Sequence, residues 1–208
     1  ALAAPAVGYF VGLGPSGTVK GSIGGGSLVS YSGGTMQFDP APIGGGDILP
    51  TFCTDLRNHV YNGDEYRYEG TLSNCKLVYL VRHYPPRLAG YSPWPDDAPG
   101  ALPTIKDEMA TRQSAVWHYS DGWMPWQPWG SGSRPSCTTY AAGSAERIAC
   151  RAWEIIEVID AQSDTCTTDN PYLGVTPISA INPLGSGYFQ DFEVELRQGA
   201  SPVSGKMV

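Results

Sequence analysis

Glycine and proline interrupt this chain so often that only short secondary-structure elements fit near its two ends. Its 208 residues include 26 glycines and 18 prolines, about a fifth of the total. That share is lower than in most disordered chains and is typical of a fold with many turns and short strands. The length suits one large domain or two small ones, and it is enough to bury a core without help from a metal.

The spacing of apolar residues changes twice along the chain. Together with cap and turn residues, this spacing predicts strands at residues 7–13, 18–23, 27–31, 35–38 and 48–60, helices at 75–81, 104–119 and 139–161, and strands again at 173–180, 188–197 and 203–208. We expect Ser73 and Thr104 to begin the first two helices. This order predicts a single α+β domain, residues 1–208. In it, a β-sandwich or barrel-like subdomain (1–70 and 167–208) carries an inserted α-helical subdomain (71–166).

Charge and hydropathy exclude two classes of partner. The formal net charge is −7, spread along the chain with no basic patch, so we expect no nucleic-acid binding. No run approaches the roughly 20 apolar residues of a membrane span, so we expect no membrane insertion. The first residues have neither the basic region nor the apolar core of a signal peptide, and no wall-anchoring motif is present. We therefore expect a processed or trimmed piece of a longer protein.

The chain has five cysteines, an odd number. In a secreted chain an odd count suggests disulfide pairs and one special thiol. We expect Cys53 to be that thiol. The other four, Cys75, Cys137, Cys150 and Cys166, are then candidates for two disulfides, which would imply an oxidising, extracellular compartment. The sequence leaves the three pairings open, and it also leaves open five reduced, buried thiols.

Two stretches sixty residues apart (113 − 53 = 60) carry the chemistry. The first is Phe-Cys-Thr-Asp at 52–55, and the second is Gln-Ser-Ala-Val-Trp at 113–117. A cysteine thiol and a glutamine amide can condense into an internal thioester and release ammonia. Strand alternation places Asp55 on the face of Cys53, where it would orient the partners. Helical spacing places Trp117 beside Gln113, with Asp121 one turn further, so the indole would shield the bond from water.

Together these stretches resemble the signature of bacterial thioester domains, the adhesive tips of surface proteins in Gram-positive bacteria. In that family an aromatic residue or leucine precedes Cys-x-Asp, and the second motif is usually Thr-Gln-x-Ala-Ile/Val-Trp. The resemblance extends over nearly the whole chain. It implies a β-sandwich or barrel with an inserted helical subdomain and a thioester between them. Cys53 would supply the sulfur and Gln113 the acyl carbon.

The resemblance also implies a function, that of a cell-surface adhesin. A lysine amine on a host or environmental surface protein, or less often a glycan hydroxyl, would attack the acyl group of Gln113 and form an isopeptide-like cross-link. The protein would then be a single-turnover binder and not an enzyme, extracellular, monomeric, and free of metal and cofactor. One position departs from the family pattern: Arg112 stands where threonine is usual, and a guanidinium at the rim would repel an incoming amine.

Three other interpretations remain. Cys53 could be an ordinary buried cysteine. It could also be the nucleophile of a hydrolase or transferase with His118 or His59. However, His118 lies off the Gln113 face, and His59 would be roughly 20 Å away along an extended strand. Loop tryptophans could instead bind a carbohydrate or protein without a covalent bond, or simply cover the helices; these are Trp94, Trp123, Trp126 and Trp129. No pair of histidines and cysteines has the spacing of zinc ligands.

Overall fold

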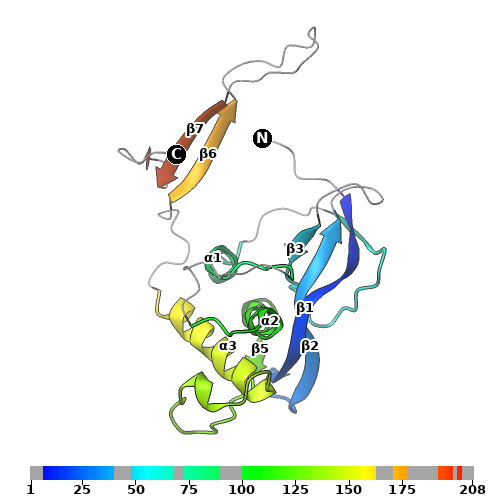
Figure 1. Cartoon of the computed structure of the whole chain (residues 1–208), viewed down its shortest axis with the longest axis vertical. Helices are drawn as coiled ribbons and strands as arrows, with labels where there is room; N and C mark the ends of the chain where they lie inside the picture. Colours follow the sequence, from blue (N-terminus) through cyan, green and yellow to red (C-terminus); the bar gives the residue numbers. More distant parts are fainter. Residues whose placement is uncertain are drawn as a thin grey trace. The chain divides into compact units, whose positions relative to one another are not determined.

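The computed structural model of the chain describes residues 7–39, 48–67, 73–89, 100–162, 171–177, 192–198 and 201–202. The chain divides into two compact units, one of residues 5–165 and one of residues 166–208 together with 1–4. Its described elements are antiparallel strands and three α-helices, so the fold class is α+β as expected (Figure 1). The division into a β subdomain and an inserted helical subdomain stays a prediction.

A long, curved hairpin forms the sheet of the larger unit. Its strands are β1 (Val7–Ile23) and β2 (Val29–Asp39), which run antiparallel. Three short strands extend it: β3 (Leu49–Thr51) beside β2, and β4 (Glu65–Arg67) and β5 (Trp123–Pro125) beside β1. The sequence predicted β5 as loop.

Each hairpin strand replaces two predicted strands, because residues expected to form turns stay inside the ladder. In β1 the register shifts between Leu13 and Ser16, so the Gly-Pro-Ser stretch forms an irregularity where a turn was expected. In β2, Gly33 and Gly34 allow β1 and β2 to approach each other closely. A Cβ atom on Gly34 would lie 2.3 Å from the carbonyl oxygen of Pro15. Glycine therefore marks tight packing here.

The helices are α1 (Cys75–His83), α2 (Ile105–Asp121) and α3 (Ala145–Asp160), with a 3₁₀ turn at Cys137–Thr139. Thr104 is the N-cap residue of α2, as predicted. Asn74, one residue after the predicted Ser73, caps α1 by accepting from two backbone amides. Ser144 caps α3, which is therefore shorter than its apolar pattern suggested.

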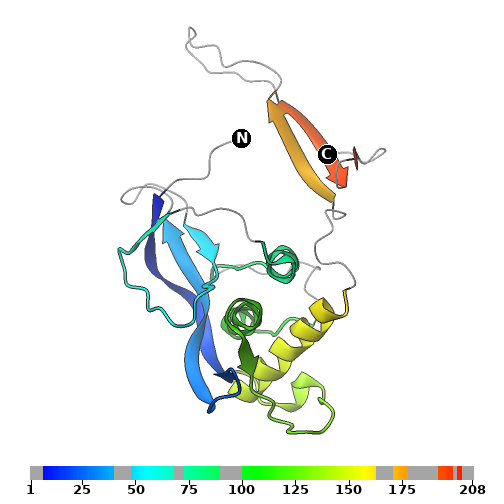
Figure 2. The same cartoon turned by 180° about the vertical axis from the view of Figure 1, so that it is seen from behind.

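Helix α2 is the central element of the larger unit. It contacts β1, β2 and β5 on one side and α1 and α3 on the other, and Figures 1 and 2 show it enclosed between the sheet and the other two helices. Every residue from Asp107 to Trp117 is buried. One apolar cluster joins α2 to α1 and α3 around Leu80, Val116 and Ile155. A second joins it to the sheet around Val19 and Trp123.

The smaller unit contains a second antiparallel sheet. Strand β6 (Pro171–Pro177) pairs with β7 (Phe192–Gln198), which pairs with the short β8 (Ser201–Pro202). The predicted strands 173–180 and 188–197 overlap β6 and β7. The strand predicted at 203–208 lies outside the described residues.

Candidate functional site

A loop carries Cys53, where the sequence predicted a continuous strand over 48–60. Only Leu49–Thr51 is strand, and the alternation argument was wrong for the residues that follow. The Asp55 carboxylate bends the chain by accepting from the backbone amides of Arg57 at 2.8 Å and Asn58 at 3.3 Å. Such local acceptors compete with a sheet ladder. Asp55 therefore shapes the loop that carries Cys53.

Asp121, in the last turn of α2, anchors the same loop. Its Oδ2 accepts from the backbone N–H of Leu56 at 2.5 Å. The sequence placed Asp121 on the Gln113 face of the helix, and the structure brings it to the loop that holds Cys53. A carboxylate that accepts from a backbone amide makes a strong, directional tether.

Two hydrogen bonds join Cys53 to Gln113, the two residues that the sequence paired. The backbone N–H of Cys53 donates to Oε1 of Gln113 at 2.9 Å, and Nε2 of Gln113 donates to the carbonyl oxygen of Cys53 at 2.6 Å. Both polar ends of the amide are thus held by the residue that carries the thiol. Gln113 is 1% exposed, whereas a glutamine on a helix is ordinarily in solvent.

A cleft of about 500 Å³ opens onto this pair. Cys53, Gln113 and Trp117 all belong to its wall. Residues from the hairpin and from the Cys53 loop complete it, including Leu13, Tyr31, Met36, Leu56, His59 and Asn62. A second hollow of about 410 Å³ also has Cys53 in its lining. The volume of the first cleft is that of a small-ligand site, and it admits an extended side chain such as lysine.

Burial and charge disfavour the ionised form of Cys53. Burial raises the pKa of the thiol above its usual value, and the carboxylates of Asp55 and Asp121 add to the rise. Hydrogen bonding by the Asp55 backbone opposes this rise, and so does the proximity of the Trp117 side chain. The Cys53 Sγ lies 2.9 Å from the carbonyl oxygen of Asp55, as a donating thiol does. The raised pKa and this contact both favour the protonated thiol over the thiolate.

Aromatic rings close one side of the site. Trp117 is 5% exposed and meets Tyr31 and Trp123 edge to face, with ring centroids 6.4 Å and 6.3 Å apart. Residues from the sheet complete this wall, since Tyr31 belongs to β2. The sequence offered no signal for Tyr31, because its strand was not assigned to any site.

The structure places the two histidines that the sequence offered as partners of Cys53 in different surroundings. Nδ1 of His118 lies 2.8 Å from the backbone oxygen of Trp123, and its ring packs against Trp153, so His118 is directed away from the cleft wall. His59 lies in the wall of the cleft with Cys53. The separation of roughly 20 Å assumed an extended strand, and the chain forms a bent loop there instead.

Arg112 is fully buried and points into the helical layer. Its Nε is 3.0 Å from Glu108 Oε1, and Nη1 donates to the carbonyl oxygen of Pro85 at 2.7 Å. Burial lowers the pKa of Arg112, while the Glu108 carboxylate supports its charge. The expectation of a guanidinium at the rim was therefore wrong: Arg112 carries no charge into the cleft.

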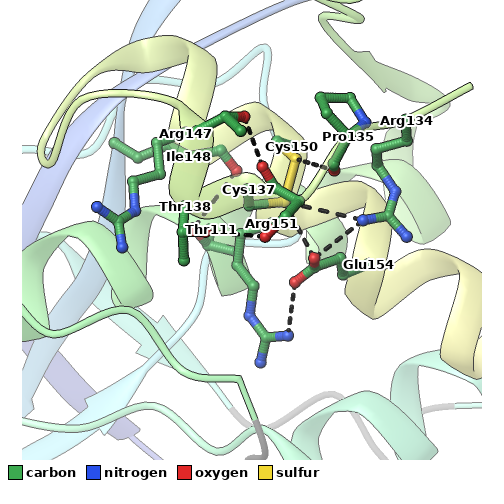
Figure 3. The surroundings of a disulfide bond; sticks show 12 residues. Thr111, Arg134, Pro135, Cys137, Thr138, Arg147, Ile148, Cys150, Arg151 and Glu154 are labelled. Atoms are coloured by element: carbon green, nitrogen blue, oxygen red, sulfur yellow. Dashed lines mark hydrogen bonds and ion pairs between the residues drawn. A yellow bond between two sulfur atoms is a disulfide. The ribbon is translucent and has the colours of Figure 1, made fainter. Parts of the chain in front are cut away.

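The disulfide predictions are confirmed where the structure describes them. Cys137 and Cys150 are bonded to each other, and Cys53 is free. Cys75 is also disulfide-bonded, and Cys166 lies outside the described residues. Figure 3 shows the Cys137–Cys150 bond at the start of α3.

Glu154 lies beside that disulfide, where its carboxylate receives Arg134 at 2.9 Å and Arg151 at 3.1 Å (Figure 3). The two sulfurs and this carboxylate come within 4.8 Å of one another. Sulfurs bonded to each other are not thiolate ligands, and the Glu154 carboxylate already forms ion pairs with Arg134 and Arg151. The cluster therefore does not suit a metal ion.

The loop tryptophans take separate positions. Trp123 is fully buried, and its indole donates to the Ser114 hydroxyl at 3.0 Å. Trp126 is half-buried beneath the Lys20 ammonium, 3.9 Å from the ring centroid, in a hollow of about 270 Å³ that Trp153 also lines. Trp129 is half-buried, and Trp94 lies outside the described residues. These rings form no shared platform in the parts of the chain that are described.

Comparison of the chain with family models, with curated proteins and with solved structures returned no match. Within the described residues, no helix has the length and apolar character that crossing a membrane requires.

Proposed function

We propose that this chain is a thioester domain of a bacterial cell-surface adhesin, which attaches covalently to amines on a target surface. One observation carries the proposal: the side-chain amide of Gln113 is hydrogen-bonded at both ends to the backbone of Cys53. Residues sixty positions apart are thus held side by side, which supports a bond between their side chains. The aromatic wall and the adjoining cleft add the shielding and the access that such a bond needs.

The same contacts support formation of the thioester. Sγ of Cys53 attacks the amide carbon of Gln113, and negative charge develops on Oε1, which faces the Cys53 N–H at 2.9 Å. That amide acts as an oxyanion donor. Nε2 departs as ammonia and takes the thiol proton, so one C–S bond replaces one C–N bond.

Transfer to the target reverses the roles. A neutral amine enters the cleft and attacks the acyl carbon, the C–S bond breaks, and Cys53 leaves with the electron pair. The proton lost by the amine goes to the departing sulfur. The products are an amide bond to the target and a free thiol, without cofactor or metal. A lysine amine is the preferred partner, with a glycan hydroxyl as the slower one.

The finer architecture belongs to the same proposal. Residues 1–70 and 167–208 form the β-sandwich or barrel, residues 71–166 the inserted helical subdomain, and the thioester lies between them. The disulfide between Cys137 and Cys150 supports an oxidising, extracellular location. A wall-anchored parent protein presents the domain, which acts as a monomer.

Intact mass spectrometry of the native protein tests the proposal. We expect a mass below that of the disulfide-bonded sequence by one ammonia, and methylamine should then add one amine per chain. Cys53→Ala and Gln113→Ala should each abolish both effects. Full sequence mass with an alkylatable thiol at position 53 in freshly purified protein would refute the thioester.

Two controls make that measurement specific. Gln127 is an exposed glutamine in the loop after β5, and Gln127→Ala should keep the deficit. The Asn62-Gly63 pair offers another route to ammonia loss, through a succinimide. A peptide map that places the deficit on a linked pair of peptides containing Cys53 and Gln113 separates the two routes.

One observation favours a second function, a cysteine hydrolase or transferase: His59 lies in the cleft wall with Cys53. This candidate requires a reactive thiol and repeated turnover. It predicts rapid alkylation of native Cys53 and its loss in His59→Ala. The raised thiol pKa and the burial of Gln113 against Cys53 favour the thioester.

A further inference from the structure

Trp117 has a buried polar group without an acceptor. Its indole nitrogen has no hydrogen-bond partner among the described residues, although the side chain is only 5% exposed. The comparable indoles of Trp123 and Trp153 each donate at 3.0 Å, to the Ser114 hydroxyl and to the carbonyl oxygen of Pro125. Buried donors are nearly always satisfied, and an exception calls for a functional explanation.

This donor belongs to the wall that holds the proposed reacting atoms. Trp117 lies one helical turn after Gln113 on α2, and both residues line the cleft together with Cys53. Cys53 also packs against the apolar cluster that contains Trp117. The sulfur of Cys53 is therefore a polar atom within the indole's own surroundings. Consistent with this position, the Trp117 side chain lowers the pKa of the Cys53 thiol.

Charge near the sulfur makes such a donor necessary. The carboxylates of Asp55 and Asp121 both disfavour negative charge on Cys53, and burial does so more strongly. Arg112, the cation nearest to Gln113 in the sequence, is turned into the helical layer. A thiolate that leaves in this environment needs neutral hydrogen-bond donors to receive its charge.

We propose that the indole N–H of Trp117 is the donor that receives the Cys53 sulfur when an amine displaces it. The inference rests on the proposed thioester. As the C–S bond breaks, its electron pair moves to Sγ, the indole N–H donates to that sulfur, and the proton of the attacking amine then converts the thiolate to the thiol. Trp117 is thus a catalytic residue of the transfer as well as a shield.

The thiol itself tests the contact without any thioester. In a Gln113→Ala background Cys53 is free, and the pH dependence of its alkylation by iodoacetamide gives its pKa. Adding Trp117→Phe keeps an aromatic wall but removes the N–H, and we expect the thiol pKa to rise by about one unit, the size of one charge-assisted hydrogen bond. If the Trp117 ring only excludes water, the pKa of the Cys53 thiol should stay unchanged or fall in Trp117→Phe. That result would overturn the proposal.

Trp153→Phe is the matched control, because it removes an indole N–H that is bonded outside the cleft. We expect it to leave the thiol pKa unchanged. In chains that carry Gln113, Trp117→Phe should slow aminolysis by methylamine about 10- to 100-fold, and Trp153→Phe should not. Equal rates in the two variants would also contradict the role of Trp117.

Two further readouts keep the outcomes separate. If the wild-type mass shows no ammonia loss, the thioester fails, while the thiol pKa still reports on the indole contact. If Trp117→Phe does not fold, the wild-type protein after methylamine treatment replaces it. There the Trp117 indole proton resonance should shift with pH at the thiol pKa of Cys53, and a resonance insensitive to that titration would reject the contact.

Discussion

Asp121 is the residue that ties the loop of Cys53 to the helix of Gln113. It lies in the last turn of α2, and its carboxylate accepts from the backbone amide of Leu56 at 2.5 Å. The spacing along a helix predicted its side of α2 but could not predict the acceptor role, because the loop was taken for a strand. Its contribution is therefore to position, since it touches neither reacting group in the described contacts.

Removing this tether should loosen the reacting pair. We expect Asp121→Ala to lower the free energy of unfolding by about 1–3 kcal/mol, because a backbone amide loses its charged acceptor. The fraction of molecules that carry the ammonia deficit should fall as well. Urea unfolding and intact mass measure the two effects. Asp121→Asn keeps an acceptor oxygen and should lose less; equal losses in both variants would speak against the hydrogen bond.

Asp160 should make stability depend on pH in the acid range. Burial opposes its ionisation, but hydrogen bonds from Lys76 and Tyr119 outweigh that and hold its pKa below the ordinary 3.8. A carboxyl with a lowered folded pKa stabilises the fold fully above its unfolded pKa and loses that contribution as the pH falls through the folded value. We expect Asp160→Asn to flatten the decline in Tm below about pH 4. A parallel decline in variant and wild type would exclude the linkage.

At the scale of elements, α2 is unusual because charged residues lie inside it. Glu108 and Arg112 are both fully buried and paired at 3.0 Å, and Arg151 of α3 reaches the same carboxylate at 3.6 Å. Because these charged residues occupy buried positions, α2 lacks the apolar spacing by which a sequence usually reveals a helix. The helix was found from its cap and from its motif, and not from amphipathic periodicity.

A substitution at Arg112 should change the stability of the fold without changing the rate of aminolysis. Arg112→Thr introduces the residue usual in bacterial thioester domains and leaves buried Glu108 with Arg151 as its remaining cation, so we expect stability to fall by about 1–3 kcal/mol. The rate of aminolysis in the folded fraction should not change, because Arg112 does not face the cleft. Arg57→Thr, at an exposed position of the loop, is the comparison for a change in rim charge. Faster aminolysis in Arg112→Thr would show that the guanidinium acts on the site.

The disulfide between Cys137 and Cys150 closes a short loop that includes the first turn of α3. Its thirteen-residue separation restricts the unfolded chain, so the double variant Cys137→Ser, Cys150→Ser should lose roughly 3 kcal/mol. The substitutions are preferable to reductant, which would also open the disulfide of Cys75. Urea unfolding measures the change. Because neither cysteine lines the cleft, the ammonia deficit should persist in folded molecules, and its disappearance would tie this loop to the site.

At the scale of the whole molecule, the fold class and the contact between Cys53 and Gln113 were predictable, but the surroundings of that contact were not. Cys53 and Gln113 were paired from residue chemistry and from the family resemblance, cap and turn residues indicated α1 and α2, and apolar spacing indicated α3. The single long hairpin was not predictable, because glycines that permit close packing look like glycines that form turns. The cleft position of His59 and the inward direction of Arg112 depend on tertiary contacts that no local pattern contains.

The net charge of −7 should favour cationic targets. We expect a lysine-rich peptide to react more slowly as salt rises from about 0.02 to about 0.5 M, since screening weakens attraction between the partners. Hydroxylamine is neutral at the pH of the assay and should react at the same rate throughout. Covalent product is counted by mass in both series. A lysine-rich peptide that shows no salt dependence would indicate that long-range attraction is absent.

The central place of α2 has a mechanical consequence. In the proposed reaction the target becomes joined to Gln113, in the interior of a helix that touches the sheet on one side and α1 and α3 on the other. A pull from the captured surface would then enter the fold at its middle, and the load would be shared among these neighbours. Force applied at a peripheral loop would unfold one strand or turn at a time. Force applied at Gln113 would instead have to separate α2 from the sheet and from the other helices at once.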